Sequence, residues 1–195
     1  MVTITNYLCK TKTNRMESNP FHPFNVFKYC PRCGLDVFKP RDSKSFFCSA
    51  CSFVYYINPA PAVIAVITNR NKQVLFARRK HDPGAGTLDL PGGFVDCNET
   101  AEQAVRREVK EEVNLEIESL TYLGTYTNQY HYKGILYFTT DLAFSCQVAN
   151  TNPIMANDDV ASVEWRLIEE VDPECIGLGS VKQLVIDLQQ GKVKE

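Results

Sequence analysis

The chain has 195 residues, of which 44% are hydrophobic and 23% charged, and its formal net charge is −2 at pH 7. This length suits one domain of ordinary size plus a small appendage, and the composition is typical of a soluble globular protein. The near-neutral charge argues against general nucleic-acid binding, and no apolar run reaches membrane-spanning length. The N-terminus lacks the apolar core of a secretory signal, so we expect a cytoplasmic protein without a membrane partner.

Two C-x2-C pairs follow a polar N-terminal extension of residues 1–24, to which we assign no function. The pairs are separated by 14 residues, a spacing typical of a zinc site closed by four thiolates. The residues between them predict a β-hairpin, and residues 25–58 resemble a zinc ribbon. Because no ligand position is left for water, we expect a structural zinc rather than a catalytic one. The predicted zinc ligands are Cys30, Cys33, Cys48 and Cys51.

Aromatic side chains near the second cysteine pair can cover the small core of this ribbon. They are Phe46, Phe47, Phe53, Tyr55 and Tyr56. The remaining cysteines have no motif spacing, so we interpret them as small apolar side chains; they are Cys9, Cys97, Cys146 and Cys175. The segment Asn58-Pro59-Ala60-Pro61 is expected to be a short, stiff hinge between the two parts of the chain. The second domain is assigned to residues 59–195.

Apolar and β-branched runs predict strands over residues 62–68 and 73–79, joined as a hairpin. A loop then leads to a short strand at 88–90 that ends in Gly92 and Gly93, where glycines allow the backbone to approach a phosphate. Further strands are predicted over 116–123, 135–144 and 160–167, whereas 124–133 is aromatic and polar. A last helix is expected to be capped by Ser180 and to end near Gln190.

A helix is predicted from about Thr100 to Val113, because Thr100 and Gln103 form a capping-box signature. At about 100° per residue, three glutamates of this helix fall on an arc that overlaps its apolar side. Carboxylates there would repel one another and lose hydration, and a hard divalent cation offsets both costs. The predicted Mg²⁺ (or Mn²⁺) ligands are Glu108, Glu111 and Glu112. Arg107 lies on a different face and can pair with Glu99.

From Gly93 onward the chain carries the pattern G-x5-E-x7-R-E-V-x-E-E-x-N-L. This resembles the Nudix box at every fixed position except Asn114, where the family has glycine. Asparagine tolerates the left-handed conformation expected at the helix end, so we expect the fold to survive. The resemblance implies an α+β fold, a Nudix α/β/α sandwich with a mixed sheet. An ordinary charged amphipathic helix is the alternative interpretation of a short motif.

Nudix enzymes hydrolyse a nucleoside diphosphate linked to another moiety, by attack of water on phosphorus. The resemblance implies that Mg²⁺ held by the box glutamates neutralises the diphosphate and orients the water, with Glu99 and Arg107 as bracing residues. The general base is a box glutamate or a carboxylate from a later segment. The later candidates are Asp158, Asp159 and Glu164, each of which could equally be a surface acid.

Several residues outside the box are candidates for substrate binding. Strand alternation sends either Arg78 or Arg79 into the cleft, where a guanidinium could bind a phosphate, while a salt-bridged strand end is the alternative. Tyr130 is the preferred aromatic for stacking on a base, although packing is the commoner role of an aromatic side chain. The other aromatic candidates are Phe24, Tyr126 and Tyr132.

A zinc ribbon before a Nudix domain resembles the NADH pyrophosphatase architecture, but the SQPWPFP-type element of that family is absent from GTYTNQYHYKG. We therefore expect a Mg²⁺-dependent pyrophosphohydrolase acting on a small-molecule nucleotide: a dinucleotide, ADP-ribose or a nucleotide-sugar. A non-catalytic Nudix-like sensor that signals through the ribbon is the alternative. An RNA-cap hydrolase is a third interpretation, which the acidic balance disfavours. Many Nudix domains pair, so a homodimer is compatible with the resemblance.

Overall fold

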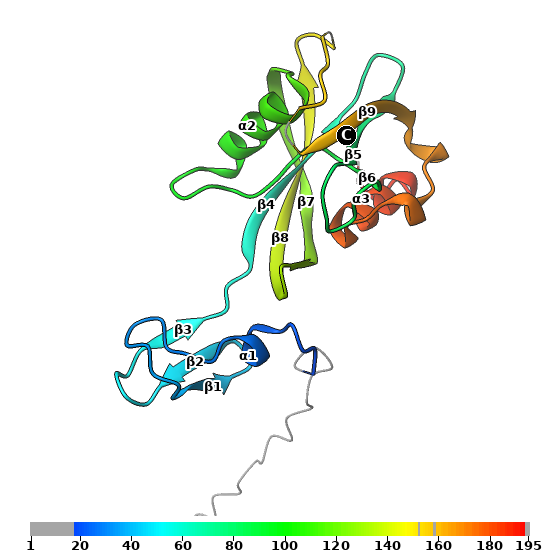
Figure 1. Cartoon of the computed structure of the whole chain (residues 1–195). Helices are drawn as coiled ribbons and strands as arrows, with labels where there is room; N and C mark the ends of the chain where they lie inside the picture. Colours follow the sequence, from blue (N-terminus) through cyan, green and yellow to red (C-terminus); the bar gives the residue numbers. More distant parts are fainter. Residues whose placement is uncertain (1–17, 152, 158, 194–195) are drawn as a thin grey trace, which may run out of the picture. The chain divides into compact units, whose positions relative to one another are not determined.

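The computed structural model describes residues 18–151, 153–157 and 159–193 (Figure 1). The chain divides between Ile57 and Asn58 into two compact units, and each has its own hydrophobic core. The boundaries predicted for the N-terminal extension, the ribbon and the second domain remain predictions. Among the described residues, none of the helices has the length and apolar character that a membrane span requires.

The first unit is a three-stranded antiparallel sheet preceded by a single helical turn. The predicted hairpin is present as β1 and β2, and a third strand pairs with β2. The elements are α1 (Pro23–Val26), β1 (Phe38–Asp42), β2 (Ser45–Cys48) and β3 (Val54–Tyr56).

The core of this unit is a stack of two phenylalanines, Phe38 and Phe46, with ring centroids 4.6 Å apart. Phe24 meets Phe46 edge-on at 5.0 Å, so this candidate for base stacking is a core residue of the first unit instead. Phe27 and Phe53 pack around the same stack.

Three of the predicted core aromatics of the ribbon are exposed instead. Phe47, Tyr55 and Tyr56 are 37%, 40% and 46% exposed. Phe47 follows the buried Phe46 along β2, and successive strand residues point to opposite faces. β3 is an edge strand of a sheet too small to bury both faces, so its two tyrosines stay at the surface.

The second unit contains two three-stranded sheets, ordered β4-β8-β7 and β6-β5-β9. In the first, β4 pairs in parallel with β8, which pairs antiparallel with β7. In the second, β5 pairs antiparallel with both neighbours. The strands are β4 (Ala60–Ile67), β5 (Gln73–Arg79), β6 (Leu88–Asp89), β7 (Ile117–Tyr132), β8 (Ile135–Val148) and β9 (Val160–Leu167).

Helices cover both faces of β4. Along this strand Val63 and Ala65 belong to the core that packs on α2 (Ala101–Val113), whereas Ile64 and Val66 belong to the core that packs on α3 (Gly179–Gln189). The near-continuous apolar run of β4 is thus explained by burial on both sides. The predicted α+β sandwich with a mixed sheet is confirmed (Figure 1). Two short 3-10 helices, Ile168–Glu170 and Pro173–Cys175, lie between β9 and α3.

Residues 124–132 continue the strand predicted over 116–123, so that β7 extends to Tyr132, with register shifts against β8 between Ile117 and Ser119 and between Tyr122 and Gly124. The turn to β8 consists of Lys133 and Gly134, with φ of 46° and 81°, which is the geometry of a two-residue hairpin turn. The polar character of this segment concealed the strand, because pairing with β8 rather than apolar alternation holds it in place.

Three local predictions are wrong. Ala60 and Pro61 belong to β4 and pair with β8, so the hinge is shorter than expected. The hairpin of β4 and β5 is reduced to the bridge between Thr68 and Val74, after which the strands enter different sheets. Ser180 does not cap α3 but lies buried inside it, because α3 begins one residue earlier.

Candidate active site

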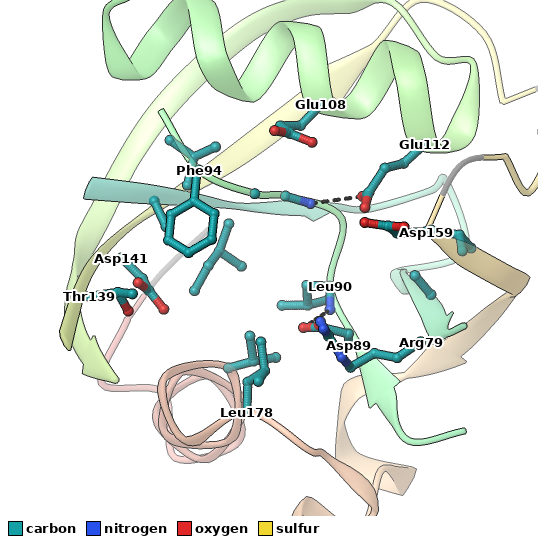
Figure 2. Close-up of a pocket in the computed structure, with 18 of the residues that line it drawn as sticks. Arg79, Asp89, Leu90, Phe94, Glu108, Glu112, Thr139, Asp141, Asp159 and Leu178 are labelled. Atoms are coloured by element: carbon teal, nitrogen blue, oxygen red, sulfur yellow. Dashed lines mark hydrogen bonds and ion pairs between the residues drawn. The ribbon is translucent and has the colours of Figure 1, made fainter. Parts of the chain in front are cut away.

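A cavity of about 350 Å³ opens beside α2 in the second unit (Figure 2). It is lined by α2, by the loop that follows β6, by the sheets and by the start of α3. Most of the predicted catalytic and substrate-binding residues meet here, although they come from distant parts of the sequence. The predicted residues that line the cavity are Arg78, Arg79, Gly92, Gly93, Arg107, Glu108, Glu111, Glu112, Tyr130 and Asp159.

Both ends of α2 are held by local interactions. The Gln103 backbone N–H donates to Thr100 Oγ1 at 3.2 Å, and the Thr100 N–H donates to the Gln103 side chain at 2.9 Å, which confirms the capping box. Asn114 adopts φ 57° and ψ 33°, the expected left-handed conformation. The helix therefore starts and stops at defined residues, and this sets the positions of its glutamates.

Glu108 and Glu112 lie one helical turn apart and face the cavity together (Figure 2). The Gly92 backbone N–H donates to Glu112 Oε2 at 3.0 Å. Burial raises the pKa of Glu112 to about 8, and the negative charge of Glu108 adds to this. Burial also raises the pKa of Glu108, against the opposing effect of Arg107. Hard oxygen ligands whose ionised form is destabilised in this way fit a divalent cation such as Mg²⁺ or Mn²⁺.

Arg107 connects the carboxylates at the rim of the cavity. It donates to Glu99 at 2.9 Å, as predicted, but also to Glu108 at 2.8 Å and to Glu111 at 3.1 Å. A further bond at 3.0 Å reaches the carbonyl oxygen of Phe94. Arg107 and Glu111 lie four residues apart on α2 and are neighbours on the same face, so the expectation that Arg107 lies on a different face is wrong. Glu111 lies outermost, with 49% of its side chain exposed.

The two glycines before α2 are required by close approach within the protein. A Cβ at Gly92 would lie 2.1 Å from the carbonyl oxygen of Val63 in β4, and one at Gly93 would lie 2.5 Å from Glu108 Oε1. The Gly93 carbonyl oxygen also accepts the Val63 N–H at 2.8 Å. These glycines let the loop run between β4 and α2, which places the Gly92 N–H beside Glu112.

Both arginines at the end of β5 line the cavity, although alternation predicts only one there. The pairing of β5 with β9 shifts register between Arg78 and Arg79, and such a bulge breaks the alternation. Arg78 donates to Glu164 at 2.9 Å, and Arg79 donates to Asp89 at 2.6 Å. Each arginine thus forms the ion pair that was the alternative to phosphate binding.

The candidate general bases have different surroundings. Asp159 lines the cavity with its carboxylate near Glu112 (Figure 2), and its side chain is 75% exposed. Glu164 does not line the cavity; although burial opposes it, Arg166 and Arg78 lower the pKa of Glu164. Asp158 lies outside the described residues.

Residues that the sequence did not single out complete the cavity. Asp89, Thr139 and Asp141 are buried in its wall, and Phe94 stands at its edge with its ring 5.8 Å from that of Tyr130. Each aspartate follows or interrupts an apolar strand pattern. This break in the pattern is the sequence feature that could have identified them as cavity residues. Of the other aromatic candidates, Tyr126 packs on the α3 core, and neither it nor Tyr132 lines the cavity.

The four motif cysteines of the first unit converge. All four Sγ atoms lie within 4.8 Å of one another, and the pairs Cys30–Cys51 and Cys33–Cys48 are 3.7 and 3.6 Å apart. Two sulfurs of a tetrahedral site with Zn–S bonds of 2.3 Å lie about 3.8 Å apart, so the cluster fits zinc. Among the described residues, no other such group of potential ligands is this compact.

The other cysteines differ from one another. Cys146 is buried in the core beneath α2, and burial raises its pKa to about 12, which confirms its apolar role. Cys97 and Cys175 are exposed, so the same expectation is wrong for them. Cys9 lies outside the described residues.

A family model described as NUDIX domain matches residues 58–184. An ADP-ribose pyrophosphatase of Methanocaldococcus jannaschii is 41% identical over 97 residues, covering 50% of this chain and 53% of that protein. An NAD-capped RNA hydrolase NudC of Pseudomonas putida is 26% identical over 161 residues, covering 83% of this chain and 55% of that protein. The chain therefore spans about half the length of these curated relatives. A crystal structure of a NUDIX hydrolase from Nitrosomonas europaea matches with a TM-score of 0.63 and 22% identity, covering 85% of this chain and 94% of that one.

Proposed function

The chain belongs to the Nudix family, and on that premise we propose that it is a Mg²⁺- or Mn²⁺-dependent pyrophosphohydrolase of nucleoside diphosphate derivatives. The observation that carries the proposal is the pair Glu108 and Glu112, two partly buried carboxylates that share one wall of a cavity and whose pKa values are raised by burial. Uncompensated, they are costly to the fold, and a binding-only protein has no need of them. A cation there also makes the cavity a site for a diphosphate, whose charge is complementary.

In this proposal Glu108, Glu111 and Glu112 hold the cation, which neutralises the diphosphate and activates a water when bound. The Gly92 N–H keeps Glu112 turned into the cavity, and Arg107 links Glu108 and Glu111 by donating to both from the same nitrogen. The water oxygen bonds to phosphorus, the anhydride P–O bond breaks, and two phosphate-containing products leave. Asp159 lines the cavity near Glu112, so we assign it as the acceptor of the water proton.

The proposed substrates are ADP-ribose and dinucleotides with a similar diphosphate. The support is that one relative is named ADP-ribose pyrophosphatase and another NAD-capped RNA hydrolase. A cavity of about 350 Å³ can enclose a large part of such a molecule. The second name makes the NAD end of an RNA a second candidate substrate, because that alignment covers 83% of the chain.

In the first unit, we propose that the four motif cysteines hold a structural zinc within a ribbon that covers residues 25–58. The support is the compact sulfur cluster, which leaves no open ligand position. The catalytic domain then occupies residues 59–195. A homodimer is compatible with membership of this family, and family membership is its sole support.

The test is a panel of ADP-ribose, NAD⁺, NADH, diadenosine polyphosphates, sugar nucleotides and a short NAD-capped RNA, each assayed with Mg²⁺. The wild type is compared with Glu112→Gln and with Glu102→Gln, an exposed glutamate of the same helix that does not line the cavity. We expect turnover of at least one compound, lost in Glu112→Gln and kept in Glu102→Gln. Tight binding without turnover of any compound would instead support the sensor.

A further inference from the structure

On the side of the cavity opposite the box glutamates, β8 places a carboxylate and a hydroxyl next to each other (Figure 2). Asp141 and Thr139 are each only 4% exposed. Asp141 Oδ1 and Thr139 Oγ1 have no hydrogen-bond partner among the described residues. The other buried acids of the cavity differ, because Asp89 is bonded to Arg79 and Glu112 to the Gly92 N–H.

The position of this pair follows from the alternation of β8. Thr139, Asp141 and Ala143 share one face of the strand, and Ala143 packs into the core under α3. On the N-terminal side of Ala143 the cavity takes the place of the packed core, so the side chains of Asp141 and Thr139 on that face line the cavity. Where the sheet pattern calls for apolar residues, this chain has an acid and a threonine.

The surroundings make this arrangement costly unless a ligand completes it. Leu178 before α3 and Phe94 of the loop line the cavity with side chains that carry no polar group (Figure 2), whereas Asn128, which pairs with Thr139 between β7 and β8, adds an amide to the lining. A buried carboxylate oxygen without a hydrogen-bond donor, such as Asp141 Oδ1, is destabilising. A ligand that donates to Asp141 would remove this cost, whereas one that presents a lone pair would increase it.

We propose that Asp141 and Thr139 form a subsite that recognises an exocyclic NH₂ group on a flat heterocycle of the substrate. The unpartnered Oδ1 of Asp141 can accept the N–H, and the hydroxyl of Thr139 can donate to the acceptor beside it. The apolar wall and the ring of Phe94 suit a planar ring rather than a ribose. This inference rests on the proposed function, because it assumes that the substrate is a nucleoside diphosphate derivative.

Two parts of a dinucleotide carry this chemistry. Adenine has its amine beside a ring nitrogen, and nicotinamide has its amide NH₂ beside a carbonyl oxygen. The proposed subsite takes one of these groups, and analogues separate them. Nicotinamide hypoxanthine dinucleotide replaces the adenine amine by an oxo group, which reverses the donor and acceptor opposite Asp141 and Thr139. Nicotinic acid adenine dinucleotide replaces the amide by a carboxylate, which repels Asp141.

The experiment measures kcat/KM for NAD⁺ and both analogues in the wild type, Asp141→Asn, Thr139→Val and the control Thr140→Val, whose side chain does not line the cavity. We expect one analogue to lose about 30-fold or more in the wild type, and which one identifies the group. Asparagine can present either a donor or an acceptor, so the discrimination should shrink to within about 3-fold in Asp141→Asn. Equal use of all three compounds by the wild type, or unchanged discrimination in Asp141→Asn, would overturn the subsite.

Binding of the mononucleotide halves tests the subsite without turnover. Calorimetry compares AMP with IMP, and nicotinamide mononucleotide with nicotinic acid mononucleotide. We expect one amino form to bind about 10-fold tighter than its partner in the wild type only. Equal affinities, or no binding of any of the four, would contradict the proposal. If the protein hydrolyses the compounds without discriminating between them, the proposed function is supported and the subsite is contradicted. If it discriminates between them without hydrolysing any, the subsite is supported and the proposed function is contradicted.

Thermal unfolding supplies the check on folding. Asp141→Asn replaces a buried carboxylate whose Oδ1 has no hydrogen-bond partner among the described residues, so we expect its Tm in the absence of ligand to rise by about 2–4 °C. Thr140→Val should stay close to the wild type. A loss of discrimination together with a higher Tm cannot come from misfolding, which would lower the Tm.

Discussion

In the ribbon, four cysteine sulfurs lie within 4.8 Å of one another, whereas the carboxylates of the second unit line one wall of an open cavity of about 350 Å³. The sulfurs come from two tight turns, and four of them are enough to saturate a tetrahedral ion. The carboxylates come from one face of α2, and Arg107 lies among three of them. The first site therefore has a full set of four ligands without a substrate, while the second leaves room for phosphate oxygens and water.

The largest expected effect tests whether the cysteine site is structural. Cys33→Ser removes one of four thiolates, and binding of structural zinc contributes on the order of 10 kcal/mol to folding. We expect the variant to lose its zinc and the amides of residues 30–56 to lose protection from hydrogen exchange. Cys97→Ser, at another exposed cysteine, should retain both. Full zinc content in Cys33→Ser would show that the site does not need all four ligands.

The next prediction compares two glutamates of the open site. Glu108→Gln should lower kcat by about 10³-fold, because in the proposed mechanism this partly buried carboxylate holds the cation directly. Glu111→Gln should lower kcat by only about 10-fold, because the Glu111 side chain is 49% exposed and water can replace it. The measurement is a Mg²⁺ titration of the rate for each variant. A larger loss for Glu111→Gln than for Glu108→Gln would reverse the assigned roles.

A third prediction concerns the stability of the metal-free protein. The pKa of Glu112 is raised from 4.5 to about 8, so the unfolded chain releases this proton at lower pH than the folded protein does. Stability is therefore unaffected below about pH 4.5, falls as the pH rises toward about 8, and then stays low. The expected loss is on the order of 5 kcal/mol.

Urea unfolding with EDTA between pH 5 and pH 8.5 measures this loss. Glu112→Gln should flatten the profile, since glutamine does not titrate, and Glu102→Gln should leave it unchanged. Mg²⁺ should restore more stability at pH 8 than at pH 5.5, because only the ionised carboxylate binds it. Parallel profiles for the wild type and Glu112→Gln would show that this carboxyl is not the titrating group.

The smallest effect lies at the end of the helix that carries the carboxylates. Asn114 is in the left-handed conformation, with φ 57°. Asn114→Gly should change the free energy of unfolding by less than about 1 kcal/mol, whereas Asn114→Val should cost about 1–2 kcal/mol. Both are measured by urea unfolding, with kcat followed in parallel. Equal stabilities of the two variants would mean that the backbone at this position can relax.

Local patterns in the sequence determined both candidate metal sites. The two C-x2-C pairs, the capping box at Thr100 and the glutamates spaced along α2 each depend on residues close in the chain. Their geometry follows from turn and helix periodicity, so spacing alone predicted it. The alternation of β2 also follows from local sequence. It places Phe47 on the face opposite the buried Phe46, outside the ribbon core.

Long-range pairing decided what the sequence could not. The bulge that turns both Arg78 and Arg79 toward the cavity exists only because β5 pairs with β9, more than 80 residues later. Residues 124–132 form a strand because β8 pairs with them. Asp141 lies in an apolar-looking strand, and its place in the cavity depends on where α3 stops covering the sheet. Hydrogen bonds and packing between distant segments are absent from any local window, which is why tertiary structure alone placed the proposed specificity subsite.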